Sequence, residues 1–249
     1  AYEIGVRLVG SEMCIRDSCD NLKELSIVAK KYKIIILSDE IYTDLKFDKK
    51  YESISSYYPE GTCITGGLSK WCGAGGWRLG FFAAPKKLSK LMDSLKVLAS
   101  ETFSTVNSPI QYAAVEAYTG DYEDYKLRTT NILKSVGNYV YKNLKSNKVL
   151  INPSQGGFYL MPEFINKKYK TSSDMCLAIL KETGVALLPG SAFGFKPNKM
   201  LARLSFTDFD GSIFLNSISN GKITNQEIKK FAPNVVEGTQ ILSKWAQKL

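Results

Sequence analysis

The stretch that decides the fold is residues 66–80, which read GGLSKWCGAGGWRLG. Its many glycines allow the backbone to approach a ligand closely. Lys70 lies among small and aromatic residues, where a lysine can serve as an amine nucleophile and base. Arg78 follows eight positions later, and arginine is the natural partner of a phosphate. The stretch predicts either a ligand site or a glycine-rich turn between strands with two surface cations.

A second polar motif precedes this stretch. The short apolar run at 34–37 is rich in β-branched residues and is followed at once by Asp39 and Tyr42. An uninterrupted run of this kind indicates a strand buried on both faces of a parallel sheet. Open α/β sheets bind ligands at the carboxyl ends of such strands. Asp39 is therefore either a ligand contact or a cap on the following turn.

The spacing of apolar residues divides the chain into two parts. Residues 20–105 alternate between helix and strand, which indicates a doubly wound α/β region. Its expected helices are at 21–29 and 86–101, and its expected strands are at 34–37, 62–65 and 79–84. Residues 106–249 predict a smaller α+β domain. Its expected helices are at 108–117, 121–145, 174–183 and from about 224 onward, and its expected strands are at 158–161, 185–188 and 201–206.

Residues 1–19 fit neither a helical nor a strand period. They resemble a translated sequencing adapter, and the alternative is an ordinary exposed terminal arm. We assign them to no domain. The sequence does not begin with Met, so we expect a chain that is incomplete or processed.

The composition excludes several classes of chemistry. The chain has no histidine, which excludes Ser-His-Asp catalysis and His-ligated zinc, and we expect no metal. The net charge of +9 comes from scattered lysines, so a solvated surface is favoured over a nucleic-acid interface. Five cysteines without a C-x-x-C pair indicate a reducing, cytoplasmic compartment. No apolar run reaches the roughly 18 residues of a membrane span, so we expect no membrane contact.

Four residues of the two motifs stand in a fixed order: Asp39, Tyr42, Lys70 and Arg78. This order and spacing resemble the fold-type I pyridoxal-phosphate enzymes, specifically the class I and II aminotransferases. The lysine-attachment signature of that family is similar to residues 67–80. Further similar segments are QYAA at 111–114, GGFY at 156–159, PGSAFG at 189–194 and ARLSF at 202–206. The resemblance covers roughly residues 20–249.

The resemblance implies a role for each residue. Lys70 would hold pyridoxal 5'-phosphate as a Schiff base and move the substrate Cα proton. Asp39 would pair with the pyridinium nitrogen, Tyr42 would hydrogen-bond the ring oxygen, and Arg78 would bind the phosphate. Arg203 would bind the substrate α-carboxylate through a two-pronged contact. The implied activity transfers an α-amino group between an amino acid and a 2-oxo acid. The implied assembly is a homodimer.

The resemblance also implies a partial structure. We expect the C-terminal part of the large-domain sheet plus the smaller C-terminal domain, because the family's N-terminal half and its Asn-Pro motif have no counterpart here. The family has Ser or Thr three positions before the lysine, where this chain has Gly67. The alternatives that remain are a C–S lyase or synthase on the same scaffold, an inactive truncated fragment, and a non-catalytic protein that keeps the fold or a basic binding module.

Overall fold

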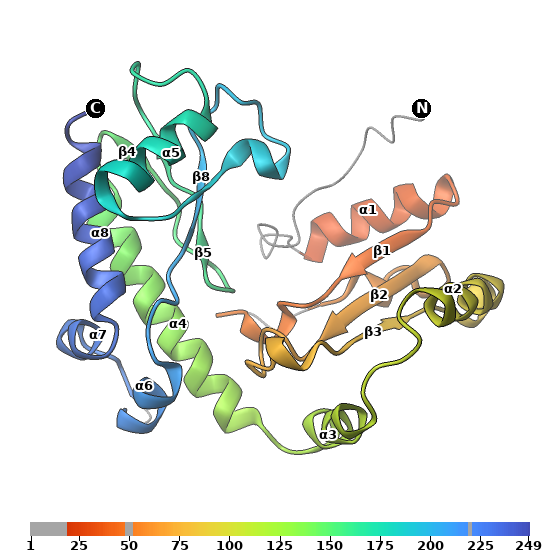
Figure 1. Cartoon of the computed structure of the whole chain (residues 1–249). Helices are drawn as coiled ribbons and strands as arrows, with labels where there is room; N and C mark the ends of the chain where they lie inside the picture. Colours follow the sequence, from red (N-terminus) through yellow and green to blue (C-terminus); the bar gives the residue numbers. More distant parts are fainter. Residues whose placement is uncertain (1–18, 48–51, 219–220) are drawn as a thin grey trace. The chain divides into compact units, whose positions relative to one another are not determined.

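The computed structural model describes residues 19–47, 52–218 and 221–249 (Figure 1). The described residues form two compact units, an N-terminal unit that ends at Lys126 and a C-terminal unit from Leu127 to Leu249. Residues 106–126 are grouped with the N-terminal unit. The domain boundary that the sequence predicts between residues 105 and 106 stays a prediction. The expectation for residues 1–19 lies, except for Cys19, outside the described residues.

A three-stranded sheet forms the centre of the N-terminal unit. Its strands are β1 (Ile36–Asp39), β2 (Thr62–Gly67) and β3 (Gly80–Ala83), in that spatial order. β1 runs parallel to β2 with Asp39 opposite Thr65, and β3 runs antiparallel to β2 with Gly67 opposite Gly80. The chain therefore leaves β1, leaves β2 and enters β3 at one and the same end of the sheet.

Helices and short turns complete the N-terminal unit. The α-helices are α1 (Cys19–Lys31), α2 (Ser89–Thr102) and α3 (Ser108–Thr119). The 3-10 turns are η1 (Thr43–Leu45), η2 (Ile54–Ser56), η3 (Pro59–Gly61), η4 (Gly75–Trp77) and η5 (Lys86–Leu88). Pro109 lies in the first turn of α3, where its missing N–H group costs nothing.

The expectation that the first strand is buried on both faces is wrong. Within the described residues β1 pairs with β2 alone, and Leu37 is 64% exposed. Ile34 and Ile35 precede the strand and are also exposed. The apolar run identified a strand correctly, but the described residues bring no second strand to its free edge.

The C-terminal unit is a small α+β arrangement. Its helices are α5 (Ser172–Thr183), α6 (Gly211–Ser217), α7 (Asn225–Phe231) and α8 (Pro233–Ala246), and the long helix α4 (Glu123–Leu144) leads into it. β4 (Val149–Leu150) pairs with β6 (Glu163–Phe164). A second antiparallel sheet has β8 (Ala202–Ser205) between β5 (Tyr159–Leu160) and β7 (Leu188–Pro189). The 3-10 turn η6 (Gly190–Phe193) directly follows β7. Among the described residues, no helix combines the length and apolar character that crossing a membrane requires.

The core of the C-terminal unit fixes which face of β8 looks outward. Val136, Val140 and Leu144 recur at helical spacing on α4 and are buried, as the amphipathic pattern predicts. Ala202 and Leu204 of β8 are buried as well. Because successive side chains of a strand point to opposite faces, Arg203 projects from the face of β8 opposite to these two residues.

Candidate active site

Asp39 lies at the carboxyl end of β1 and is held by the neighbouring strand. Its Oδ1 accepts hydrogen bonds from the hydroxyl of Thr65 and from the backbone N–H of Ile41, both at 3.3 Å. The second bond caps the turn that follows β1, and the first ties the carboxylate to β2. Both interpretations of Asp39 from the sequence are thus compatible: it closes a turn and presents a carboxylate at the ligand-binding end of the sheet.

Lys70 lies on a tight turn after β2, beside Tyr42. The backbone N–H of Ala74 donates to the carbonyl of Leu68 at 3.1 Å, and that of Gly73 donates to the carbonyl of Lys70 at 3.3 Å. Leu68 is completely buried and anchors the turn. The Nζ of Lys70 is 5.6 Å from the ring centroid of Tyr42, within the range of a cation–π contact. The structure therefore brings together the predicted lysine and tyrosine from two different connections.

Gly67 explains one departure from the family pattern. A Cβ atom at this position would lie 2.9 Å from the carbonyl oxygen of Leu79 and 3.1 Å from the Cα of Gly80. Both are backbone atoms: Leu79 directly precedes β3 and Gly80 is its first residue. Because β3 is paired with β2, neither atom can move aside without a large cost in energy. The close approach of β2 and β3 just before Lys70 requires glycine here, where the resemblance leads one to expect Ser or Thr.

Arg78 has an uncommon backbone conformation. Its φ of 54° and ψ of 38° lie in the left-handed region, which costs a residue with a Cβ atom about 1 kcal/mol. Its Nη1 donates to the carbonyl of Gly75 at 3.0 Å, and the residue is exposed. Strained backbone of this kind concentrates at binding sites, which favours a ligand role for Arg78 over a plain surface cation.

Lys126 supports the site and was not identified from the sequence. Its Nζ is 3.2 Å from a carboxylate oxygen of Asp44 and 4.9 Å from the ring centroid of Trp71. Burial lowers the pKa of Lys126, but the contacts with Asp44 and Glu123 outweigh burial and raise the pKa above its ordinary value. Lys126 thus joins η1, which follows Tyr42, to the turn that carries Lys70. Only its spacing from Glu123 is visible in the sequence.

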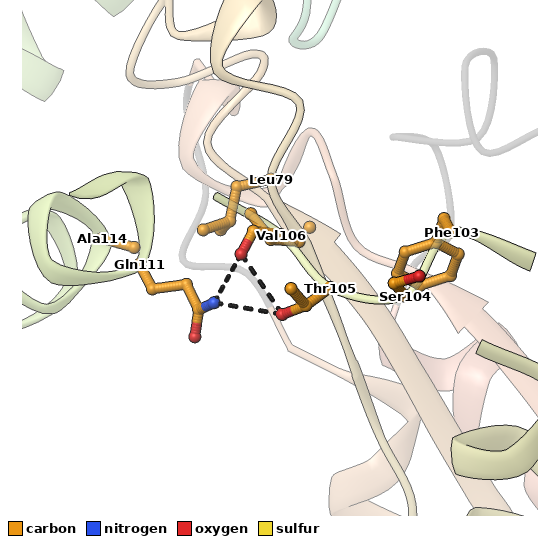
Figure 2. Close-up of a pocket in the computed structure, with 8 residues that line it drawn as sticks. Leu79, Phe103, Ser104, Thr105, Val106, Gln111 and Ala114 are labelled. Atoms are coloured by element: carbon orange, nitrogen blue, oxygen red, sulfur yellow. Dashed lines mark hydrogen bonds between the residues drawn. The ribbon is translucent and has the colours of Figure 1, made fainter. Parts of the chain in front are cut away.

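Two cavities border the connection between β2 and β3. The first, of about 410 Å³, is lined by Leu79, Gly80, Ala114 and Gln111 and by residues 103–106 (Figure 2). Figure 2 shows the Gln111 side chain directed at this segment, where its Nε2 donates to the carbonyl of Val106 at 2.7 Å. The second cavity has a volume of about 380 Å³, and four of its eight lining residues are aromatic. Its lining residues are Trp71, Cys72, Trp77, Ala113, Glu116, Ala117, Tyr122 and Tyr125.

Cys63, Cys72 and Cys176 are free thiols without signs of activation. Burial raises the pKa of Cys63 and Cys72, and it raises the pKa of Cys176 to about 11. A thiol whose pKa is raised is a poor nucleophile at neutral pH, so Cys72 next to the lysine turn serves packing. In the part of the chain that the structure describes, no cluster of three or more His, Cys, Asp or Glu side chains could bind a metal ion.

Arg203 belongs to the C-terminal unit, whereas Asp39, Tyr42, Lys70 and Arg78 belong to the N-terminal unit. Arg203 is half-buried on β8, and the rings of Tyr159 and Phe193 lie close to its guanidinium group. The sequence indicated Arg203 through the segment at 202–206, and it gave no sign of these two aromatic contacts.

The chain matches a known family over most of its length. Residues 18–210 fit the family described as aminotransferase class I and II. The chain belongs to this family. It is 37% identical over 174 residues to a probable N-acetyl-LL-diaminopimelate aminotransferase of Bacillus subtilis, covering 70% of this chain and 43% of the relative. It is 34% identical over 201 residues to an aspartate aminotransferase of Geobacillus stearothermophilus, covering 77% and 50%.

Solved aminotransferase structures show the same fold. An alanine aminotransferase from Pyrococcus furiosus superposes with a TM-score of 0.75 at 26% identity, covering 93% of this chain and 54% of that one. The chain therefore has part of the fold-type I architecture of these enzymes. It spans about half the length of the curated relatives that it matches.

Proposed function

We propose that this aminotransferase chain contributes to the transfer of an α-amino group between an amino acid and a 2-oxo acid, with pyridoxal 5'-phosphate bound covalently at Lys70. The observation that carries the proposal is the placement of Lys70 against Tyr42 at the end of the sheet where Asp39 also lies. Family membership supports it independently.

The residues of the N-terminal unit suit this cofactor chemically. The site has a carboxyl group for the ring nitrogen at Asp39, an amine at Lys70 and a guanidinium for the phosphate at Arg78. The backbones at Gly67 and Gly80 approach too closely to admit a side chain between them. When bound, the cofactor supplies an electron sink for the bond that breaks at the substrate Cα.

The chain's own residues have distinct tasks in this chemistry. Once the substrate amine has replaced Lys70 on the cofactor, the freed Nζ of Lys70 would take up the proton that leaves the substrate Cα. The tight turn at residues 68–74 limits the positions that this amine can adopt. The Thr65 hydroxyl donates a hydrogen bond to Asp39 and thereby orients the carboxylate. Tyr42 is buried, so its ring packs in one position beside the Nζ of Lys70. Arg203 binds the α-carboxylate and aligns the substrate.

We also propose a homodimer in the cytoplasm that acts in amino-acid biosynthesis. The resemblance to the family supports the dimer, and so do large apolar side chains that are exposed on α2 and α3, among them Val97, Leu98 and Val115. The free thiols of the described cysteines are compatible with a reducing compartment. Sedimentation of the chain at several concentrations tests the dimer: a mass that stays at one chain refutes it.

Reductive labelling tests the proposed function. We expect the chain mixed with pyridoxal 5'-phosphate, reduced with borohydride and digested to carry the cofactor on the peptide that contains Lys70. Lys70→Met should lose the label, whereas Lys96→Met, at an exposed lysine on α2, should keep it. No label, or a label on another lysine, contradicts the proposal. Product analysis separates transfer, which yields a 2-oxo acid and aminated cofactor, from β-elimination, which yields pyruvate, ammonia and unchanged cofactor.

A further inference from the structure

The guanidinium group of Arg203 lies over two aromatic rings. Its Cζ is 4.3 Å from the ring centroid of Tyr159 and 4.4 Å from that of Phe193. The three side chains come from β8, β5 and η6, which are separate elements of the C-terminal unit. All three side chains are half-buried. Both distances from the Arg203 Cζ to the ring centroids are within the range of a cation–π interaction.

Strand register and one glycine place the two rings. Tyr159 lies opposite Ser205, so it stands on the same face of the sheet as Arg203, two residues away along β8. Gly190 packs directly against Leu201, since a Cβ atom at position 190 would lie 2.8 Å from the Cβ of Leu201. Its N–H donates to the carbonyl of Leu201 at 2.7 Å. This close approach starts η6 against β8 and brings Phe193 over Arg203.

We propose that Tyr159 and Phe193 are positioning residues that hold the Arg203 guanidinium in the plane required for binding the substrate α-carboxylate. The inference rests on the proposed function. All five N–H groups of a guanidinium lie in its plane, so rings stacked on it direct its hydrogen bonds to its edge. A carboxylate binds best at that edge, through two parallel hydrogen bonds. Rings that fix the plane before binding lower the entropy lost on binding.

The stacking can be observed on the chain without measuring activity. Aromatic ring currents shift the Hε resonance of a stacked arginine upfield in ¹⁵N-correlated NMR spectra, and Arg203→Lys assigns that resonance. The ring-removing variants are Tyr159→Leu and Phe193→Leu, and the ring-keeping variants are Tyr159→Phe and Phe193→Tyr. Phe195→Leu is the matched control, because Phe195 lies two residues after the end of η6 and its ring contacts Lys199 instead. Thermal melts confirm that each variant is folded.

Binding is measured by titration with L-alanine, and ethylamine serves as the matched probe that lacks a carboxylate. We expect L-alanine, and not ethylamine, to move the Arg203 resonance. Each ring-removing variant should return the resonance downfield and weaken L-alanine binding about fivefold. The ring-keeping variants and Phe195→Leu should behave like the parent chain.

Three results overturn the inference: a parent resonance without an upfield shift, no response to L-alanine, or leucine variants that bind L-alanine as well as the parent. Failure of the proposed function is separate, because it appears as absence of cofactor labelling at Lys70 while the Arg203 resonance and its L-alanine response behave as expected.

Discussion

Replacing Gly67 with the family's serine should destabilise this chain. The new Cβ would lie 2.9 Å from the Leu79 carbonyl oxygen, 3.1 Å from the Gly80 Cα and 3.4 Å from the Ile41 Cδ1. The first two atoms belong to backbone at the start of β3, which is paired with β2, so relief requires the strands to separate. Overpacking of this kind costs about 1–3 kcal/mol. We therefore expect Gly67→Ser to lower the free energy of unfolding by about 2 kcal/mol.

Urea denaturation followed by far-ultraviolet circular dichroism measures this change. The matched control is Gly76→Ala in the same connection, where a Cβ would meet no atom within 4 Å. That control should leave stability unchanged or raise it by up to about 1 kcal/mol, because alanine restricts the unfolded chain. A Gly67→Ser chain as stable as the parent, beside a control that behaves as expected, would refute the view that close strand approach demands glycine.

Three further predictions concern residues that support the site or the core. Lys126→Met removes the contacts with Asp44 and Trp71 and should lower the free energy of unfolding, measured by urea denaturation, by about 1 kcal/mol. Because folding raises the pKa of Lys126, the parent should be more stable than the variant below pH 10.5 and should lose this extra stability as the pH rises above that value; a stability difference that does not depend on pH would count against the ion pair. Burial raises the pKa of Cys176 from 9.0 to about 11, so stability should fall as pH rises through that interval, and Cys176→Ala should remove this part of the pH dependence. Arg78→Gly should stabilise the chain by about 1 kcal/mol in thermal or urea unfolding, because glycine adopts the left-handed backbone conformation without strain. The same variant should bind the cofactor more weakly in equilibrium dialysis, and unchanged binding would show that Arg78 does not contact the phosphate.

Amphipathic spacing predicted the long elements well. The helix expected at 121–145 is found at Glu123–Leu144, because its apolar residues repeat over many turns. The strand expected at 185–188 is wrong apart from Leu188, which pairs with Arg203. Gly184 ends α5 in a left-handed conformation, and the chain reaches β8 only at Leu188. The two-residue strands β4 and β6 and the short helix α6 were missed, since elements of that length show no period.

The candidate site was predictable where its residues are close in sequence. Asp39 and Tyr42 follow a recognisable strand, and Lys70 and Arg78 share one glycine-rich connection. The contact of Lys126 with Asp44 depends on tertiary packing, which a linear pattern cannot show. The same holds for the two rings on Arg203. The steric need for Gly67 was also hidden, because it arises from the approach of Leu79 on the neighbouring strand.

Among the described residues β1 pairs only with β2, and this has a consequence for handling the purified chain. Unpaired strand edges with exposed apolar side chains such as Leu37 recruit other copies and seed aggregation. A net charge of +9 opposes this by mutual repulsion between copies. Dissolved salt weakens that repulsion and leaves apolar attraction intact. Light scattering should therefore rise with ionic strength, and a charged residue introduced at Leu37 should suppress the rise.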